Sequence, residues 1–240
     1  MNRTRTIAWC CRGFACAATT LATVAFLAPA AGASSVTASS VIKAAQQAIA
    51  AQRSVHVEFV AHSSSPSRTE RIVADVGLSS GKEAVSEGTA QAHLVFSTAV
   101  VYVSGNSAGL TTLFGLSSAG AKKVGGKWES WKPGSSQYDN LKADLTMSSV
   151  LALLPEAKGT KLSIGENSYV LKWTIRATTS TPALTNTLRL SAGPSTLPQS
   201  EYATASGGTK VTTTLSNWGE QVLVDVPPAA SVIASSKVGS

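Results

Sequence analysis

The feature that most constrains the fold is an alternation of apolar and polar residues that recurs in several short segments. Val55, Val57 and Phe59 alternate with His56 and Glu58, so one side of an extended strand would be buried and the other solvated. The same period of two occurs in residues 72–76, 92–96, 169–175, 184–190 and 211–215. Clusters of Gly, Pro, Ser or Asn separate these segments at short intervals, which favours antiparallel strands joined by hairpins.

Three other segments have a helical pattern. Residues 34–53 place Val41, Ile42, Ala45 and Ile49 on one face, with Ser39 or Ser40 as the expected N-cap. Residues 107–124 and 146–157 are apolar without alternation; the second should begin at Thr146 and end at Pro155, whose ring cannot continue a helix. The sequence therefore predicts an α+β fold, in which a strongly curved antiparallel sheet carries a few helices across one face.

The N-terminus has the order of regions found in a secretory signal peptide. Arg3, Arg5 and Arg12 come first, an apolar stretch follows over residues 14–27, and small residues fill positions 31–33. The apolar stretch is too short for a confident membrane span of about 20 residues. We therefore predict cleavage of residues 1–33, a single domain over residues 34–240, and a secreted or cell-envelope location.

Cysteine placement and charge limit the chemistry of the exported chain. Cys10, Cys11 and Cys16 all precede the predicted cleavage site, so disulfides and thiolate metal sites are not expected. Because Cys16 also precedes most of the apolar stretch, a lipid anchor is not expected either. The net charge of +7 includes the signal arginines, and the other basic residues are scattered rather than interleaved with aromatics, so no nucleic-acid partner is expected.

The sequence offers few groups for catalysis. Alternation places His56, His62 and His93 on outward strand faces. Glu83 and Glu87, four residues apart in an alternating segment, are likewise expected on one exposed face. No serine stands in a Gly-x-Ser-x-Gly elbow, and no Gly-rich phosphate loop is present. We therefore predict that the protein is not an enzyme and has no metal or cofactor; a hydrolase is the weakest of the functions considered.

The order of several segments resembles the LppX/LprG group of actinobacterial envelope proteins, which is similar in fold to the lipoprotein carrier LolA. The resemblance covers about residues 50–230 and depends on segment order and spacing rather than on one diagnostic motif. The segments are "VVYVSGNSAGLTTLFG", "GKWESWKPGSSQYDNL", "LTMSSVLALLPEAKG", "SAGPSTLPQSEY" and "TLSNWGEQVLVDVPPAASV". One departure is the missing lipidated cysteine, which members of the group commonly carry.

The resemblance implies a LolA-like half-barrel sheet closed by helices over an apolar cavity, and a monomeric, non-catalytic carrier of acylated lipid or glycolipid. Transient contacts with the membrane surface or with envelope proteins would accompany transport. The alternative is a protein-interaction or envelope-sensing module of the same fold with a filled core. We expect nine residues to line the cavity, although an ordinary core position is the alternative for each: Val57, Phe59, Leu94, Phe96, Leu110, Leu113, Phe114, Leu151 and Leu154.

Two local segments of the chain also allow specific predictions. Leu110, Leu113 and Phe114 are spaced as one stripe of a helix, which could form a gate at the rim of the sheet. In "SNWGEQVLVDVPP", Gly219 should allow a bend after Trp218, and residues 222–224 should form a last strand that the two prolines end.

Overall fold

The computed structural model describes residues 35–64, 67–97, 99–178 and 182–238. The predicted signal peptide and all three cysteines lie outside these residues. The described residues form one open sheet of 12 strands in the order β12-β6-β5-β4-β3-β2-β1-β11-β10-β9-β8-β7. Neighbouring strands are antiparallel except β12 and β6, which are parallel.

The sheet consists of two meanders that meet where β1 pairs with β11. The first runs through β1 (Ser54–Ser64), β2 (Ser67–Gly77), β3 (Ser80–Glu87), β4 (Ala90–Ser97), β5 (Val100–Gly105) and β6 (Trp128–Trp131). The second runs through β7 (Lys161–Ile164), β8 (Ser168–Ile175), β9 (Leu184–Ser191), β10 (Pro198–Ala205) and β11 (Lys210–Ser216). The predicted antiparallel strands are therefore confirmed.

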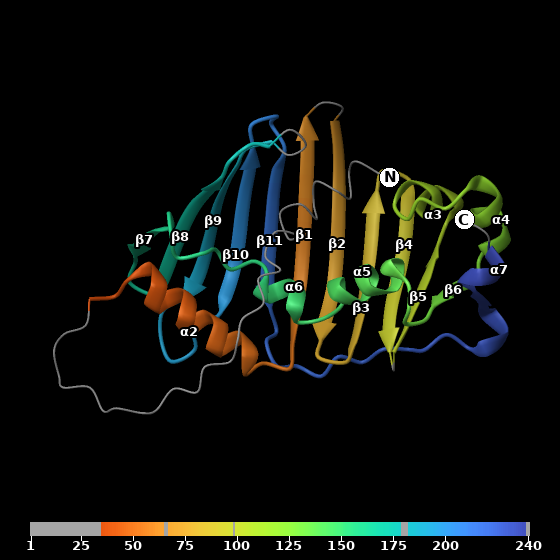
Figure 1. Cartoon of the computed structure of the whole chain (residues 1–240), viewed down its shortest axis with the longest axis horizontal. Helices are drawn as coiled ribbons and strands as arrows, with labels where there is room; N and C mark the ends of the chain where they lie inside the picture. Colours follow the sequence, from red (N-terminus) through yellow and green to blue (C-terminus); the bar gives the residue numbers. More distant parts are fainter. Residues whose placement is uncertain (1–34, 65–66, 98, 179–181, 239–240) are drawn as a thin grey trace.

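Helices lie on one face of this sheet, called here the inner face. α2 (Ala38–Ala50), α6 (Ser148–Leu151) and α5 (Ser136–Asp144) follow one another across the strands near one end, as Figure 1 shows. α3 (Ser107–Thr112) and α4 (Ser118–Val124) lie at the β4–β5 end of the sheet (Figure 1). The chain ends with η1 (Ala229–Ser231), β12 (Val232–Ala234) and α7 (Ser235–Val238). The predicted α+β sheet with helices across one face is thus confirmed in outline, but the described helices are short and cross only part of that face.

The first helix shows how local sequence determines these boundaries. Thr37, rather than the predicted Ser39 or Ser40, is the N-cap of α2: its Oγ1 accepts a hydrogen bond from the Ser40 backbone N–H at 3.2 Å. The Ser40 hydroxyl accepts one in return from the Thr37 N–H at 3.0 Å, which completes a capping box. The predicted apolar face is confirmed: Val41, Ile42 and Ala45 are buried with leucines of β8 and β9, and Ile49 is buried in the main cluster of the sheet.

The segment after β11 differs from the prediction. Residues 217–228 contain no strand, and Val222 and Val224 are only half-buried. β11 already pairs with β1 on one side and β10 on the other, so a strand that follows it directly has no free ladder beside it. The segment instead runs along the end of the sheet toward β12 (Figure 1). The bend at Gly219 is confirmed by its positive φ of 81°, and the Trp218 indole donates a hydrogen bond to the Pro198 carbonyl oxygen at 3.2 Å.

Candidate ligand-binding face

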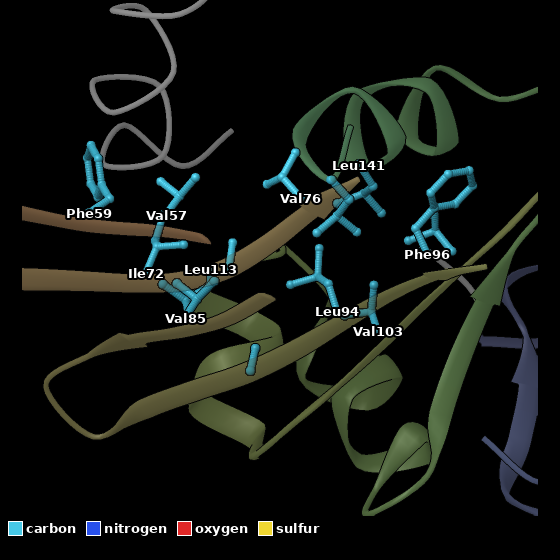
Figure 2. Packing of buried hydrophobic residues seen from close by; sticks show 14 of the residues in the cluster. Val57, Phe59, Ile72, Val76, Val85, Leu94, Phe96, Val103, Leu113 and Leu141 are labelled. Atoms are coloured by element: carbon cyan, nitrogen blue, oxygen red, sulfur yellow. The ribbon is translucent and has the colours of Figure 1, made fainter. Parts of the chain in front are cut away.

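The inner face is a broad apolar surface. Val57 and Phe59 of β1 lie beside Ala74 and Ile72 of β2 in the ladder, and all four side chains are buried. Figure 2 shows the packing of this surface across β1 to β5, to which α5 contributes Leu141. A second apolar cluster lies under α2, where Leu171 of β8 and Leu188 and Leu190 of β9 pack against the buried face of the helix. The inner face could therefore bury a long apolar ligand or simply form the core beneath the helices.

Most of the residues predicted to line a cavity lie on this face. Leu94 and Phe96 of β4 are buried in the same cluster as Val57 and Phe59. Leu154 is partly buried and packs against both clusters. Leu151 differs, because it is 38% exposed at the end of α6. The structure therefore brings these residues together apart from Leu151, and their role as ligand contacts stays a prediction.

The proposed gate residues belong to one short helical turn. Leu110 is fully buried in α3 and Leu113 is 4% exposed, while Phe114 is partly buried against the same cluster. The turn ends at Gly115, whose φ is +72°. The Gly115 N–H donates a hydrogen bond to the Thr111 carbonyl oxygen, and the Leu116 N–H donates one to the Leu110 carbonyl oxygen. With Gly115 in the left-handed region, its bond to Thr111 is that of an αL helix C-cap, which ends the turn directly after the three apolar side chains.

Buried carboxylates on the inner face were missed by the sequence analysis, and the prediction that Glu83 and Glu87 are exposed is wrong. The two side chains are 5% and 9% exposed, and Glu70 lies directly opposite Glu87 in the ladder. Glu87 accepts a hydrogen bond from the Arg68 guanidinium at 3.3 Å. The signal was present, because Val85 shares the strand face of both acids and is buried.

A second polar group interrupts the apolar surface on β9, β10 and β11. Asn186, Glu201 and Thr213 are 1%, 6% and 1% exposed. Glu201 of β10 lies directly opposite Thr213 of β11. On the other side of β10, Asn186 of β9 pairs with Ala203, which makes Asn186 a diagonal neighbour of Glu201. Neither polar atom of the Asn186 side chain has a hydrogen-bond partner among the described residues. Such an amide costs free energy unless a partner reaches it, so it points to a polar group that could be bound there.

Little space remains where α6 meets the sheet. A cavity of about 10 Å³ lies between Val57 and Ala74 on the sheet and Val150 and Leu153 near α6. That volume is about the minimum for one water molecule. In this conformation, therefore, α6 packs directly onto the strands, and a ligand at this place would have to displace it.

The three histidines lie on the outer face, as the alternation predicted, but His56 is not simply solvated. Its Nδ1 lies 2.6 Å from Asp75 Oδ1, and the other oxygen of Asp75 lies 3.1 Å from Lys82 Nζ. Burial raises the pKa of Asp75, but the hydrogen bonds and charges of His56 and Lys82 outweigh it and lower the pKa below its ordinary value. His62 has Thr69 as a hydrogen-bond partner at 3.1 Å, and His93 is exposed.

Glu129 of β6 is a buried carboxylate on the strand next to the edge strand β12. Burial raises its pKa above the ordinary value of 4.5, although a hydrogen bond with Trp131 opposes the shift. The folded protein therefore holds this proton more tightly than the unfolded chain does. The contribution of Glu129 to stability is complete below the unfolded pKa and is lost as the pH rises through the folded pKa.

We therefore expect Glu129→Gln to raise the thermal midpoint at pH 8, because the buried charge is removed, and to leave it unchanged near pH 4. Thermal unfolding at both pH values measures the difference. Glu166→Gln, at an exposed turn, is the control and should change neither midpoint. An equal gain for Glu129→Gln at both pH values would show that the effect does not come from ionisation.

Within the described ranges, no three His, Cys, Asp or Glu side chains converge as metal ligands would. None of the helices in the described part of the chain has the length and apolar character needed to cross a bilayer.

Comparison with known proteins finds similarity among solved structures. No family model matches the chain, and no curated protein matches it. LprF from Mycobacterium bovis has a TM-score of 0.46 at 17% identity, over 79% of this chain and 96% of LprF. The Mycobacterium tuberculosis lipoprotein LppX has a TM-score of 0.47 at 18% identity, over 78% and 98%. The Pseudomonas aeruginosa MucA/MucB complex gives a TM-score of 0.34 at 14% identity, over 85% of this chain and 60% of the matched one. LppX, one of the proteins that give the predicted group its name, is thus among these neighbours. Similarity of this extent does not assign the chain to a family.

Proposed function

We propose that the protein is a non-catalytic carrier that binds an acylated lipid or glycolipid on the inner face of the sheet. The observation that carries the proposal is the combination of a broad apolar surface with the buried, unpartnered amide of Asn186 beside Glu201 and Thr213. An amphiphile matches both parts: its acyl chain covers apolar side chains, and its hydroxyl or amide groups reach the polar side chains.

Burial of the acyl chain supplies most of the binding free energy in this proposal. Each methylene removed from water contributes about 0.8 kcal/mol, so a long chain binds without directed polar contacts. The polar group near Asn186 adds selectivity, since a ligand without hydrogen-bonding groups there would leave the amide unpaired. Catalysis is not part of the proposal: His56 and its partner Asp75 lie on the opposite face of the sheet from this surface.

The cellular setting follows from the predicted signal peptide. An exported carrier without a cysteine after the cleavage site would act as a secreted or envelope protein that is not anchored by a lipid of its own. It would exchange its ligand through transient contacts with a membrane surface or with envelope proteins. Neither step requires more than a monomer.

A protein-interaction or sensing module with a filled core is the second candidate. The small cavity of about 10 Å³ beneath α6 favours it, because side chains already fill that part of the inner face. The two candidates differ in one respect that can be measured: a carrier accepts an acyl chain beside α3 and α6, whereas a filled module does not.

The substitution Leu113→Trp tests the carrier. Leu113 is buried on the last turn of α3, so the larger side chain should occupy the space needed by an acyl chain. We expect uptake of a fluorescent fatty-acyl probe to be lost, with a stability loss of about 1 to 3 kcal/mol from overpacking. Probe fluorescence and thermal unfolding provide the two measurements.

Two control variants separate blocked uptake from general damage. Ile42→Ala removes a buried side chain of α2 in the other apolar cluster and should destabilise the protein while uptake below the melting temperature persists. Leu223→Trp, at a position that is 67% exposed in the segment after β11, should change neither property. Full uptake by Leu113→Trp would contradict a carrier whose acyl chain enters at α3.

A further inference from the structure

A groove of about 370 Å³ lies on the outer face of the sheet, over β2, β3 and β4. Its floor includes Val73, Ala84 and Val95, one from each strand. Val73 lies directly opposite Ala84 in the ladder. Because the methyl group of Ala84 is short beside the larger side chains around it, a hollow remains at the centre of the floor.

The border of the groove includes an aromatic side chain and a carboxylate from distant parts of the sequence. Trp128 of β6 points to the outer face, because the next residue, Glu129, is buried on the inner side. The indole is partly buried and forms an apolar wall. Asp225, which is exposed, comes from the segment that follows β11 and adds a carboxylate.

An ion pair and a histidine complete the border. Lys82 Nζ lies 3.1 Å from Asp75 Oδ2, so both groups are held beside the floor. His93 is exposed on β4, directly opposite Ala84 in the ladder. The groove therefore combines the nitrogen groups of Lys82 and His93 with the carboxylate of Asp225 around an apolar floor, while the two oxygens of Asp75 already face His56 and Lys82.

We propose that this outer groove binds a saccharide of one or two neutral sugar units. A sugar ring has apolar C–H faces that can pack against Trp128 and the floor, and hydroxyl groups that donate and accept hydrogen bonds at once. Lys82, His93 and Asp225 offer both kinds of partner. The volume lies at the lower end of the range of about 300 to 1,000 Å³ for small-ligand sites, which fits a ligand of this size.

Charge separates a neutral sugar from anionic ligands. The border has two carboxylates, Asp75 and Asp225, against the single ammonium of Lys82, and that ammonium is already paired. A phosphate or carboxylate ligand would find no excess of positive charge. The groove lies on the face opposite the proposed lipid-binding surface, so saccharide binding there does not depend on whether the protein carries a lipid.

The test is saturation-transfer NMR of the exported protein with maltose, cellobiose and mannobiose. We expect at least one of these disaccharides to bind, and Ala84→Leu, which fills the hollow, to weaken that binding about tenfold or more. Asp225→Ala, on an exposed loop, should weaken it severalfold through a lost charged hydrogen bond. The controls are Thr212→Leu on the outer face of β11 and Asp139→Ala on α5, both at exposed positions outside the groove.

A second arm asks whether the sugar is free or lipid-linked. The probe is a hexosyl diacylglycerol in phosphatidylcholine vesicles. Vesicle binding that Ala84→Leu weakens, without binding of soluble disaccharides, would assign the groove to a lipid head group. Binding at the inner face would instead persist in Ala84→Leu. The proposal is overturned if Ala84→Leu changes the binding of neither the disaccharides nor the vesicles.

Discussion

Gly109→Ala is expected to destabilise the protein by about 3 kcal/mol, at the upper end of the range for overpacking. Gly109 lies in α3 where the helix crosses β4, and a Cβ built there would overlap the carbonyl oxygen of Gln91. It would also lie 2.6 Å from the Gln91 carbonyl carbon and 2.9 Å from its nitrogen. Since backbone atoms cannot rotate away, α3 must move off the strand.

Thermal unfolding should show this loss as a midpoint about 6 to 12 °C lower, given about 2 to 4 °C per kcal/mol for a chain of this size. Amide hydrogen exchange of residues 107–115 should become faster, because α3 no longer packs closely against β4. The matched control is Gly207→Ala, where an added Cβ meets nothing within 4 Å. Equal midpoints for the two alanine variants would contradict the close approach of α3 to β4.

Leu188→Ala is the second substitution with a large expected effect, a loss of about 2 to 5 kcal/mol. Leu188 is fully buried on β9 between Leu171 of β8 and Glu201 of β10, under the apolar face of α2. The substitution removes apolar contacts and leaves a cavity that the surrounding strands can only partly close.

Denaturant unfolding measures this loss as a change in the free energy of unfolding. Leu223→Ala is the control, because Leu223 is 67% exposed in the segment after β11 and should change stability by no more than about 0.5 kcal/mol. If both variants unfold at the same denaturant concentration, α2 does not seal the β8–β9 side of the sheet as the structure indicates.

Alternation was sufficient to predict several of the strands, but it did not predict which residues on a buried face are polar. Val85 marks the inner face of β3, and Glu83 and Glu87 share that face by the period of two alone. The spacing of four does place both acids on one strand face, but the prediction that this face is exposed is wrong. Whether a strand face is covered depends on the elements packed on it, and these come from distant parts of the chain.

α5 was missed for a related reason. Its segment is rich in Ser and polar residues and follows two tryptophans and a Pro-Gly pair, a composition typical of a turn. The helical signal was nevertheless present: Ser135 caps the Tyr138 N–H at 3.2 Å, and Tyr138 and Leu141, three residues apart, are both buried. A short helix with two anchoring side chains depends on the surface it packs on, which local propensity cannot reveal.

The most direct test of the carrier function is native mass spectrometry of the exported protein purified from its own host without detergent. The proposal predicts a major species heavier than the polypeptide by the mass of one lipid, which organic extraction removes and which contains at least one acyl chain. A preparation that shows only the mass of the bare polypeptide, and whose organic extract contains no lipid in amounts comparable to the protein, would contradict it.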